Sequence, residues 1–229
     1  MSSRSTEALS KGVNTSTKNP GLFMPMLAPM IIQLIFLILA YVVFPQVIYF
    51  FGIPIAVIPN PYLIWGGYFI ASIIGFIASC MIVDMANDVI NKRPMNLKKS
   101  MNVVIGRLGT LFVAAIISAI FFLIFVLIPV ALFIITIAII EKTDAIESTK
   151  RAFDFFVKNL GEVLVFVIVV IVVSLILGIG FAFIPVVGAY IGAIVSWILN
   201  AIFTVAAVHF YLSLKQPLAP PPPPPPPPS

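Results

Sequence analysis

The sequence is poor in charge. Only 9% of its 229 residues are charged, whereas 61% are hydrophobic; a soluble domain carries about 25% charged residues. A soluble core of this size cannot hide so much apolar surface, so we expect lipid to be the solvent. Elements that span a lipid bilayer are helices or a closed barrel. The apolar residues occur in long runs rather than in alternation, which excludes the barrel.

Cysteine and histidine are almost absent. Cys80 and His209 are single, which excludes a disulfide framework and a metal site built from His and Cys. Hydrolytic metal sites need several His, Asp or Glu ligands at fixed spacing. The sequence also contains no Ser/His/Asp set, phosphate-binding glycine loop or HExxH motif. We therefore predict a protein that is not an enzyme, uses no cofactor and binds no nucleic acid.

Three uncharged runs, residues 19–83, 108–140 and 163–214, predict the fold. A membrane span needs about 20 residues, and each run is interrupted by proline, at Pro45 to Pro59, at Pro129 and at Pro185. The sequence thus predicts an all-α polytopic membrane bundle of about six spans in three hairpins. The spans are expected at about residues 20–44, 62–90, 103–127, 130–142, 160–183 and 187–214. Residues 103–142 also fit a re-entrant pair, since their apolar run is short for two spans.

The remaining segments are polar or amphipathic. They are an N-terminal segment at 1–19, amphipathic segments at about 95–106 and 143–158, and a tail at 216–229. All 13 basic and 8 acidic residues lie in the N-terminal segment, in 84–107, in 141–162 or at Lys215, and the opposite turns carry no charge. The positive-inside rule then places both termini and both amphipathic segments in the cytoplasm.

Segment 143–158 has a helical pattern with two faces. Asp144 and Glu147 resemble a capping box, and Glu147 precedes Arg151 by the four residues that favour an ion pair. We predict that this helix lies in the membrane interface, with anionic lipid headgroups as partners. Alternatively, it is a solvated helix whose aromatic residues pack on the ends of other helices. The expected anchors are apolar on one face and basic on the other: Ile146, Phe153, Phe156, Leu160, Lys150, Arg151 and Lys158.

Residues 139–170 carry a motif that suggests a family. In this motif a short helix leads into a span. The helix begins with an acidic residue and then carries an alanine, a basic pair and an aromatic residue. The matching residues are Glu141, Ala145, Lys150, Arg151, Ala152, Phe153, Lys158 and Asn159. This motif resembles the repeating element of the membrane domain in some bacterial glycerophosphoryl diester phosphodiesterases and in related uncharacterised prokaryotic membrane proteins. The sequence contains neither their soluble phosphodiesterase domain nor its metal site. The resemblance therefore implies a multi-pass domain of a prokaryotic plasma membrane without chemistry of its own.

Two carboxylates, Asp84 and Asp88, lie one helical turn apart near the end of the second predicted span. Carboxylates in membrane segments are candidates for a cation or proton site. Alternatively, they lie at headgroup level and pair with the basic residues between Lys92 and Arg107. Because these basic residues follow so closely, we predict pairing.

The last predicted span contains a polar seam and a glycine pair. The seam consists of Ser196, Asn200, Thr204 and His209. Such residues form a solute path or, more commonly, hydrogen bonds between helices. Gly188 and Gly192 form a GxxxG pattern, which predicts close helix packing within the monomer or between copies, so that an oligomer is one of the options.

The tail contains an unbroken run of prolines from Pro220 to Pro228. Such a run forms a polyproline II rod that docks in the aromatic groove of a partner protein, or else remains a stiff, inert terminus. With the amphipathic segments, it predicts a membrane-organising or accessory protein that works through inner-leaflet helices and a cytoplasmic tail. The alternative is a small-solute or ion transporter or channel that uses the polar residues of the second and sixth spans.

Overall fold

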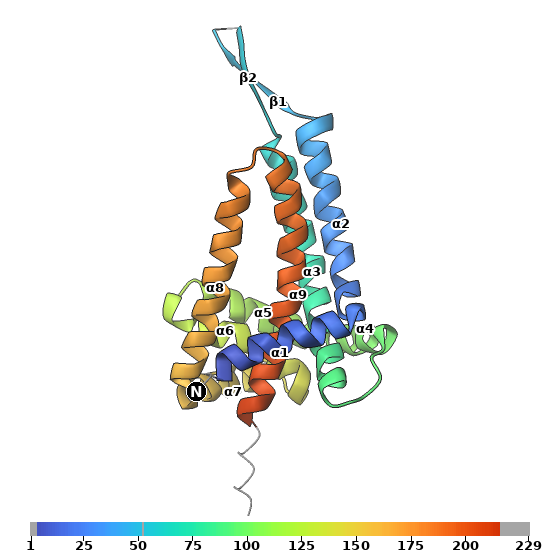
Figure 1. The fold of residues 1–229 in the computed structure, drawn as a ribbon, viewed down its shortest axis with the longest axis vertical. Helices are drawn as coiled ribbons and strands as arrows, with labels where there is room; N and C mark the ends of the chain where they lie inside the picture. The colour runs from blue at the N-terminus through green and yellow to red at the C-terminus, as the bar shows by residue number, and fades with distance from the viewer. Residues whose placement is uncertain (1–3, 52, 216–229) are drawn as a thin grey trace, which may run out of the picture.

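In the computed structural model, which describes residues 4–51 and 53–215, most of the chain is α-helical (Figure 1). Four helical stretches are long and apolar enough to cross a membrane. The first, Pro20–Val43, comprises a 3-10 turn Pro20–Phe23, α2 Met24–Ile38 and a π-turn Leu39–Val43; the others are α3 Pro61–Ile90, α8 Leu160–Ala182 and α9 Val187–Lys215. The predicted all-α class is confirmed, and these candidate spans match four of the six predicted ones.

The predicted spans at 103–127 and 130–142 are not confirmed. This region forms α4 Leu97–Gly106, α5 Leu108–Phe122, a 3-10 turn Phe125–Leu127 and α6 Ile128–Glu141. Helices α4 and α5 meet at a 75° bend, and the 15 residues of α5 reach about 22 Å, short of the roughly 30 Å hydrocarbon core. The described residues therefore contain four candidate spans, or five if the bent pair is one span.

Arg107 lies at the bend between α4 and α5 and contacts the end of α6. Its guanidinium donates hydrogen bonds to the carbonyl oxygens of Ala138 and Thr143. The C-terminal carbonyls of a helix lack partners within the helix and attract cations. Arg107 therefore ties the α4–α5 bend to the end of α6, which terminates at Lys142 in a left-handed conformation.

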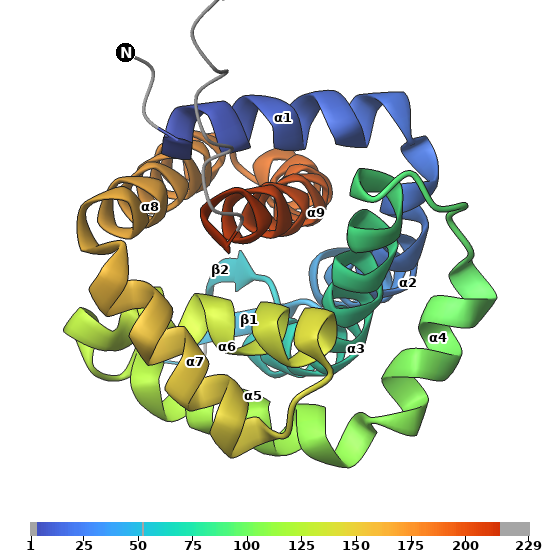
Figure 2. The ribbon, with the colours of Figure 1, turned by 90° about the horizontal axis from the view of Figure 1, so that it is seen from below.

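The shorter helices gather at one end of the bundle. Seen from below, α1 Arg4–Lys18, α4, α5 and α7 Ala145–Lys158 surround the lower parts of α3, α6 and α9 (Figure 2). We call α1, α4, α5 and α7 the basal ring. The predicted polar segment 1–19 thus contains a helix, and the predicted amphipathic segments correspond to α4 and α7.

Helix α1 is held tightly on α9 and α8. At the crossing with α9, a Cβ on Gly12 would lie only 2.6 Å from Cβ of Ala206. The hydroxyl of Ser5 donates to the backbone oxygen of Glu162 (2.7 Å) and to its carboxylate (2.8 Å). Small residues and local polar contacts therefore dock this polar helix across two apolar ones.

The aromatic core also lies at the basal end. Phe133 of α6 is fully buried, with ring centroids 5.0 Å from Phe155, 6.0 Å from Phe166 and 5.7 Å from Phe210. Of the four candidate spans, α8 has the smallest share of its residues buried inside the protein. The large aromatic side chains therefore pack together at the level of the basal ring.

An antiparallel hairpin projects from the opposite end (Figure 1). It consists of β1 Gln46–Phe50 and β2 Ile53–Ile58. Only an irregular connection was expected here, because Pro54 and Pro59 interrupt the apolar pattern. The polyproline run from Pro220 to Pro228 lies outside the described residues, so its prediction is not tested.

Candidate functional site

The first candidate site is the outer surface of the basal ring, and α7 shows how it is built. Asp144 caps this helix by accepting a hydrogen bond from the backbone N–H of Glu147 at 2.8 Å, and Glu147 pairs with Arg151 at 2.8 Å. The predicted cap and ion pair are both confirmed. They start α7 at Ala145 and hold its charged face together.

The inner face of α7 differs from the predicted one. Phe155 and Phe156 were expected to lie at lipid depth, but they are only 9% and 7% exposed and lie in the protein core. Apolar residues lie on both sides of α7, and hydropathy alone cannot tell which side meets the protein. The alternative in which aromatic residues pack on other helices therefore describes Phe155 and Phe156.

The other predicted anchors point outward. Ile146 is 65% exposed, Phe153 44% and Leu160, the first residue of α8, 49%. Lys150, Arg151 and Lys158 are exposed beside them. The rest of the ring also carries outward apolar side chains, on α1, α4 and α5: Val13, Leu97, Met101, Ile105, Leu108, Phe112 and Ile116. The ring thus presents apolar and basic groups together at one level of the molecule.

Glu141 joins the ring to the spans. Its carboxylate accepts hydrogen bonds from Arg151 of α7, and from Tyr211 and Lys215 of α9. Burial by itself raises the pKa of Glu141, but the hydrogen bonds from Lys215, Tyr211 and Arg151 outweigh it and lower this pKa to about 2. Glu141 is part of the sequence motif in residues 139–170, but no local pattern predicts that it joins α6 to α7 and α9.

Asp84 and Asp88 are buried within the protein, at 8% and 1% exposure. Asp88 pairs with Arg93 (2.9 Å) and Lys99 (2.5 Å), whereas Asp84 accepts a hydrogen bond from the hydroxyl of Ser100 at 2.6 Å. The predicted pairing with the following basic residues is therefore observed for Asp88, and a hydroxyl takes that place for Asp84. The two carboxylates tie α3 to α4 and to the loop between them.

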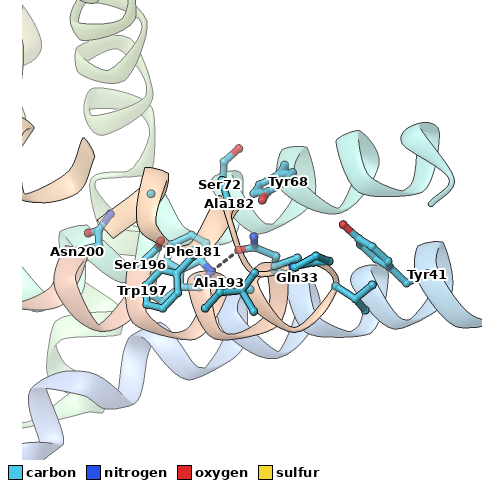
Figure 3. A pocket seen from close by; sticks show the side chains of 17 residues that line it. Gln33, Tyr41, Tyr68, Ser72, Phe181, Ala182, Ala193, Ser196, Trp197 and Asn200 are labelled. Atoms are coloured by element: carbon cyan, nitrogen blue, oxygen red, sulfur yellow. Dashed lines mark hydrogen bonds between the residues drawn. The ribbon is translucent and has the colours of Figure 1, made fainter. Parts of the chain in front are cut away.

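The second candidate site is a cavity of about 560 Å³ between the upper parts of α2, α3, α8 and α9 (Figure 3). A further cavity of about 400 Å³ lies between α3, α8 and α9, with α6 contributing Leu132, Ile135 and Thr136. Ser196 and Asn200 line both cavities. The two spaces therefore follow one another along α9.

The predicted polar seam divides at these cavities. Asn200 accepts a hydrogen bond from the hydroxyl of Ser79 at 3.3 Å, and Thr204 donates to the backbone oxygen of Asn200 at 2.7 Å. His209 instead lies 2.8 Å from the hydroxyl of Thr15 on α1. Ser196, Asn200 and Thr204 thus face the cavities, while His209 belongs to the contact between α1 and α9.

Close packing at the top of α9 involves both predicted glycines. A Cβ on Gly188 would lie 2.0 Å from the backbone oxygen of Phe181, and a Cβ on Gly192 would lie 3.3 Å from Cβ of Phe181. Both glycines therefore pack against α8 of the same chain. This contact forms one wall of the upper cavity.

Comparison with protein-family models, with curated proteins and with solved structures found no match to this chain. Within residues 4–51 and 53–215, no group of three or more His, Cys, Asp or Glu side chains could hold a metal ion.

Proposed function

We propose that this protein organises a membrane by embedding the basal ring in one leaflet. The observation that carries the proposal is the ring itself. Its helices lie at one level around the lower parts of α3, α6 and α9 (Figure 2), and their exposed side chains are apolar and basic. Helices of this kind lie at the boundary between headgroups and acyl chains and respond to curvature and to anionic lipid. A ring at one end only adds area to one leaflet, which favours curvature toward that side.

The charges support one orientation in the membrane. We propose that the ring and both termini lie on the cytoplasmic side, because the positive-inside rule favours that side for the basic residues of the ring. In the absence of a match in any comparison, the resemblance to phosphodiesterase membrane domains and the assignment to a prokaryotic plasma membrane stay predictions. Anionic lipid headgroups are the partners that the exposed lysines favour.

The proposal is tested by comparing the density of the protein on curved membrane tubes with its density on the flat vesicle membrane. The protein is reconstituted into giant vesicles, labelled after reconstitution at Asp154→Cys with an impermeant dye, and observed on tubes pulled from the vesicles. Only molecules with the ring outside are then counted, and we expect them to be enriched on the tubes. A variant with Ile146, Phe153 and Val157 changed to Ser should lose the enrichment, and one with the same residues changed to Leu should keep it. Equal density of the wild type on tube and vesicle would refute the proposal.

A second candidate function is passage of an uncharged solute. The specific observation in its favour is that Ser196 and Asn200 line two successive cavities. Ion transport through Asp84 and Asp88 has less support, because Asp88 is paired with two cations. Swelling of protein-containing vesicles in small uncharged solutes, compared between the wild type and Asn200→Leu, separates this function from the first.

A further inference from the structure

The upper cavity contains an amide whose orientation is determined by its neighbour. Trp197 donates a hydrogen bond from Nε1 to Oε1 of Gln33 at 2.6 Å (Figure 3). An indole N–H can only donate, so the atom of Gln33 that faces it must be the amide oxygen. The amide nitrogen, Nε2, therefore points away from Trp197.

This nitrogen has no hydrogen-bond acceptor among the described residues. Gln33 is only 5% exposed, and both Gln33 and Trp197 line the cavity. Among the described residues, Ser16 Oγ is the only fully buried side-chain polar atom without a partner, so Nε2 of Gln33 is accessible from the cavity. An amide N–H that meets neither water nor an acceptor costs free energy. A molecule in the cavity that supplies an acceptor would remove this cost.

The cavity also restricts the charge of its occupant. None of the side chains that line it is Asp, Glu, Lys, Arg or His, and the same holds for the cavity of about 400 Å³ next to it. A charged group brought into such a place would lose its hydration without gaining a counter-charge. The occupant is therefore uncharged.

The cavity lies at the depth of the hydrocarbon core, so a ligand enters it from the lipid. Gln33 lies near the middle of the candidate span Pro20–Val43, and Trp197 lies within the candidate span α9. A group in the middle of a span is at hydrocarbon depth, so lipid-soluble molecules reach it most readily. The volume of about 560 Å³ lies within the roughly 300–1,000 Å³ range of ligand pockets, and the neighbouring cavity offers room for an apolar tail.

We propose that this cavity binds an uncharged, lipid-soluble carbonyl compound whose oxygen accepts a hydrogen bond from Nε2 of Gln33. Both an ester lipid and a quinone have this chemistry. The inference rests on the cavity alone, so it holds whether or not the basal ring organises membranes and whether or not a solute passes.

The fluorescence of Trp197 provides the assay. The chain has two tryptophans, and Trp65 is 75% exposed outside this cavity, so Trp65→Phe leaves Trp197 as the only reporter. A short-tailed quinone, decylubiquinone, is titrated into this variant in nanodiscs, and we expect quenching that saturates. Dioctanoylglycerol is then added as a competitor. Competition shows that esters bind as well, and its absence restricts the site to quinones.

Two controls separate a specific site from general partition into lipid. The Trp197→Phe variant, which reports from Trp65, should show only linear quenching without saturation. Decylbenzene, which has a similar tail and no carbonyl, should not displace the quinone. Saturation that is equal for both tryptophans, or full displacement by decylbenzene, would overturn the proposal.

Gln33→Met tests the hydrogen bond directly. This change keeps the length of the side chain but removes the donor, so the quinone should bind about five- to tenfold more weakly, as expected for the loss of one neutral hydrogen bond. Gln46→Met, the same change in β1 and outside the cavity, should bind as the parent does. Unchanged affinity in folded Gln33→Met would overturn the proposal; if that variant does not fold, the comparison of quinone with decylbenzene decides.

Discussion

Replacing Glu141 with glutamine should weaken the junction between the basal ring and the spans. Glu141 accepts hydrogen bonds from Arg151, Tyr211 and Lys215, so one carboxylate connects α6 with α7 and α9. Glutamine is nearly isosteric but carries no charge, and one end of its amide can only donate. We expect it to keep part of the contact to Tyr211 and to lose most of the attraction to the two cations.

The size of the effect follows from the pKa of this group. The pKa falls from 4.5 to about 2 in the folded protein, which corresponds to about 3 kcal/mol at roughly 1.36 kcal/mol per pKa unit. The side chains of Arg151 and Lys215 are 46% and 52% exposed, however, and solvent screens such pairs. We therefore expect Glu141→Gln to lower the free energy of unfolding at pH 7 by about 1–2 kcal/mol.

The same pKa predicts a dependence on pH. The unfolded carboxyl has its ordinary pKa of 4.5, and the folded one is at about 2, so the unfolded chain binds a proton more readily. The stability from Glu141 is therefore complete above about pH 5 and is lost progressively as the pH falls toward 2. Glu141→Gln should lack this part of the acid sensitivity.

Denaturant titration in mixed micelles at pH 7, 4 and 3, followed by circular dichroism, measures both effects. Glu7→Gln is the matched control, because Glu7 pairs with Lys11 on the exposed face of α1; we expect no resolvable change at pH 7. If Glu141→Gln is as stable as the wild type at pH 7 and loses stability equally on acidification, the reasoning about this junction is wrong.

Three further predictions concern packing and topology. Gly12→Leu should displace α1 from Ala206 and cost about 1–3 kcal/mol through overpacking, detected as faster proteolysis within α1. Phe133→Ala should leave a cavity among the aromatic rings and lower the free energy of unfolding by about 3–5 kcal/mol, measured by denaturant titration. Single cysteines at Ala56 and at Asp154 should react with an impermeant reagent from opposite sides of sealed vesicles, and labelling of both from one side would contradict the topology.

Local features of the fold could be predicted because their causes lie within a few residues. The cap at Asp144 and the pair between Glu147 and Arg151 depend on spacings of three and four along one helix, and both are observed. The same holds for the pairing of Asp88 with Arg93, which follows it by five residues. The class of the protein was also predictable, since charge and apolar run length alone distinguish lipid from water as the solvent.

The face of each helix that meets the protein was not predictable. In a soluble protein the apolar face is the buried face, but lipid accepts apolar side chains as well as a core does. Phe153 and Phe156 therefore look equivalent in the sequence, although the structure exposes the first and buries the second. The hairpin β1–β2 was missed for a related reason, because its apolar residues are as compatible with a strand as with a loop.

The sequence by itself determined the solvent of this protein, four of its spans and the end at which its charges collect, because each depends on composition or on neighbouring residues. Only the tertiary structure decided that α5 is part of the ring and that α6 lies inside it, that Glu141 meets Lys215, and that Trp197 meets Gln33. These last two pairs are separated by 74 and 164 residues along the chain. Contacts at such separation arise from the packing of whole helices, which no local pattern records.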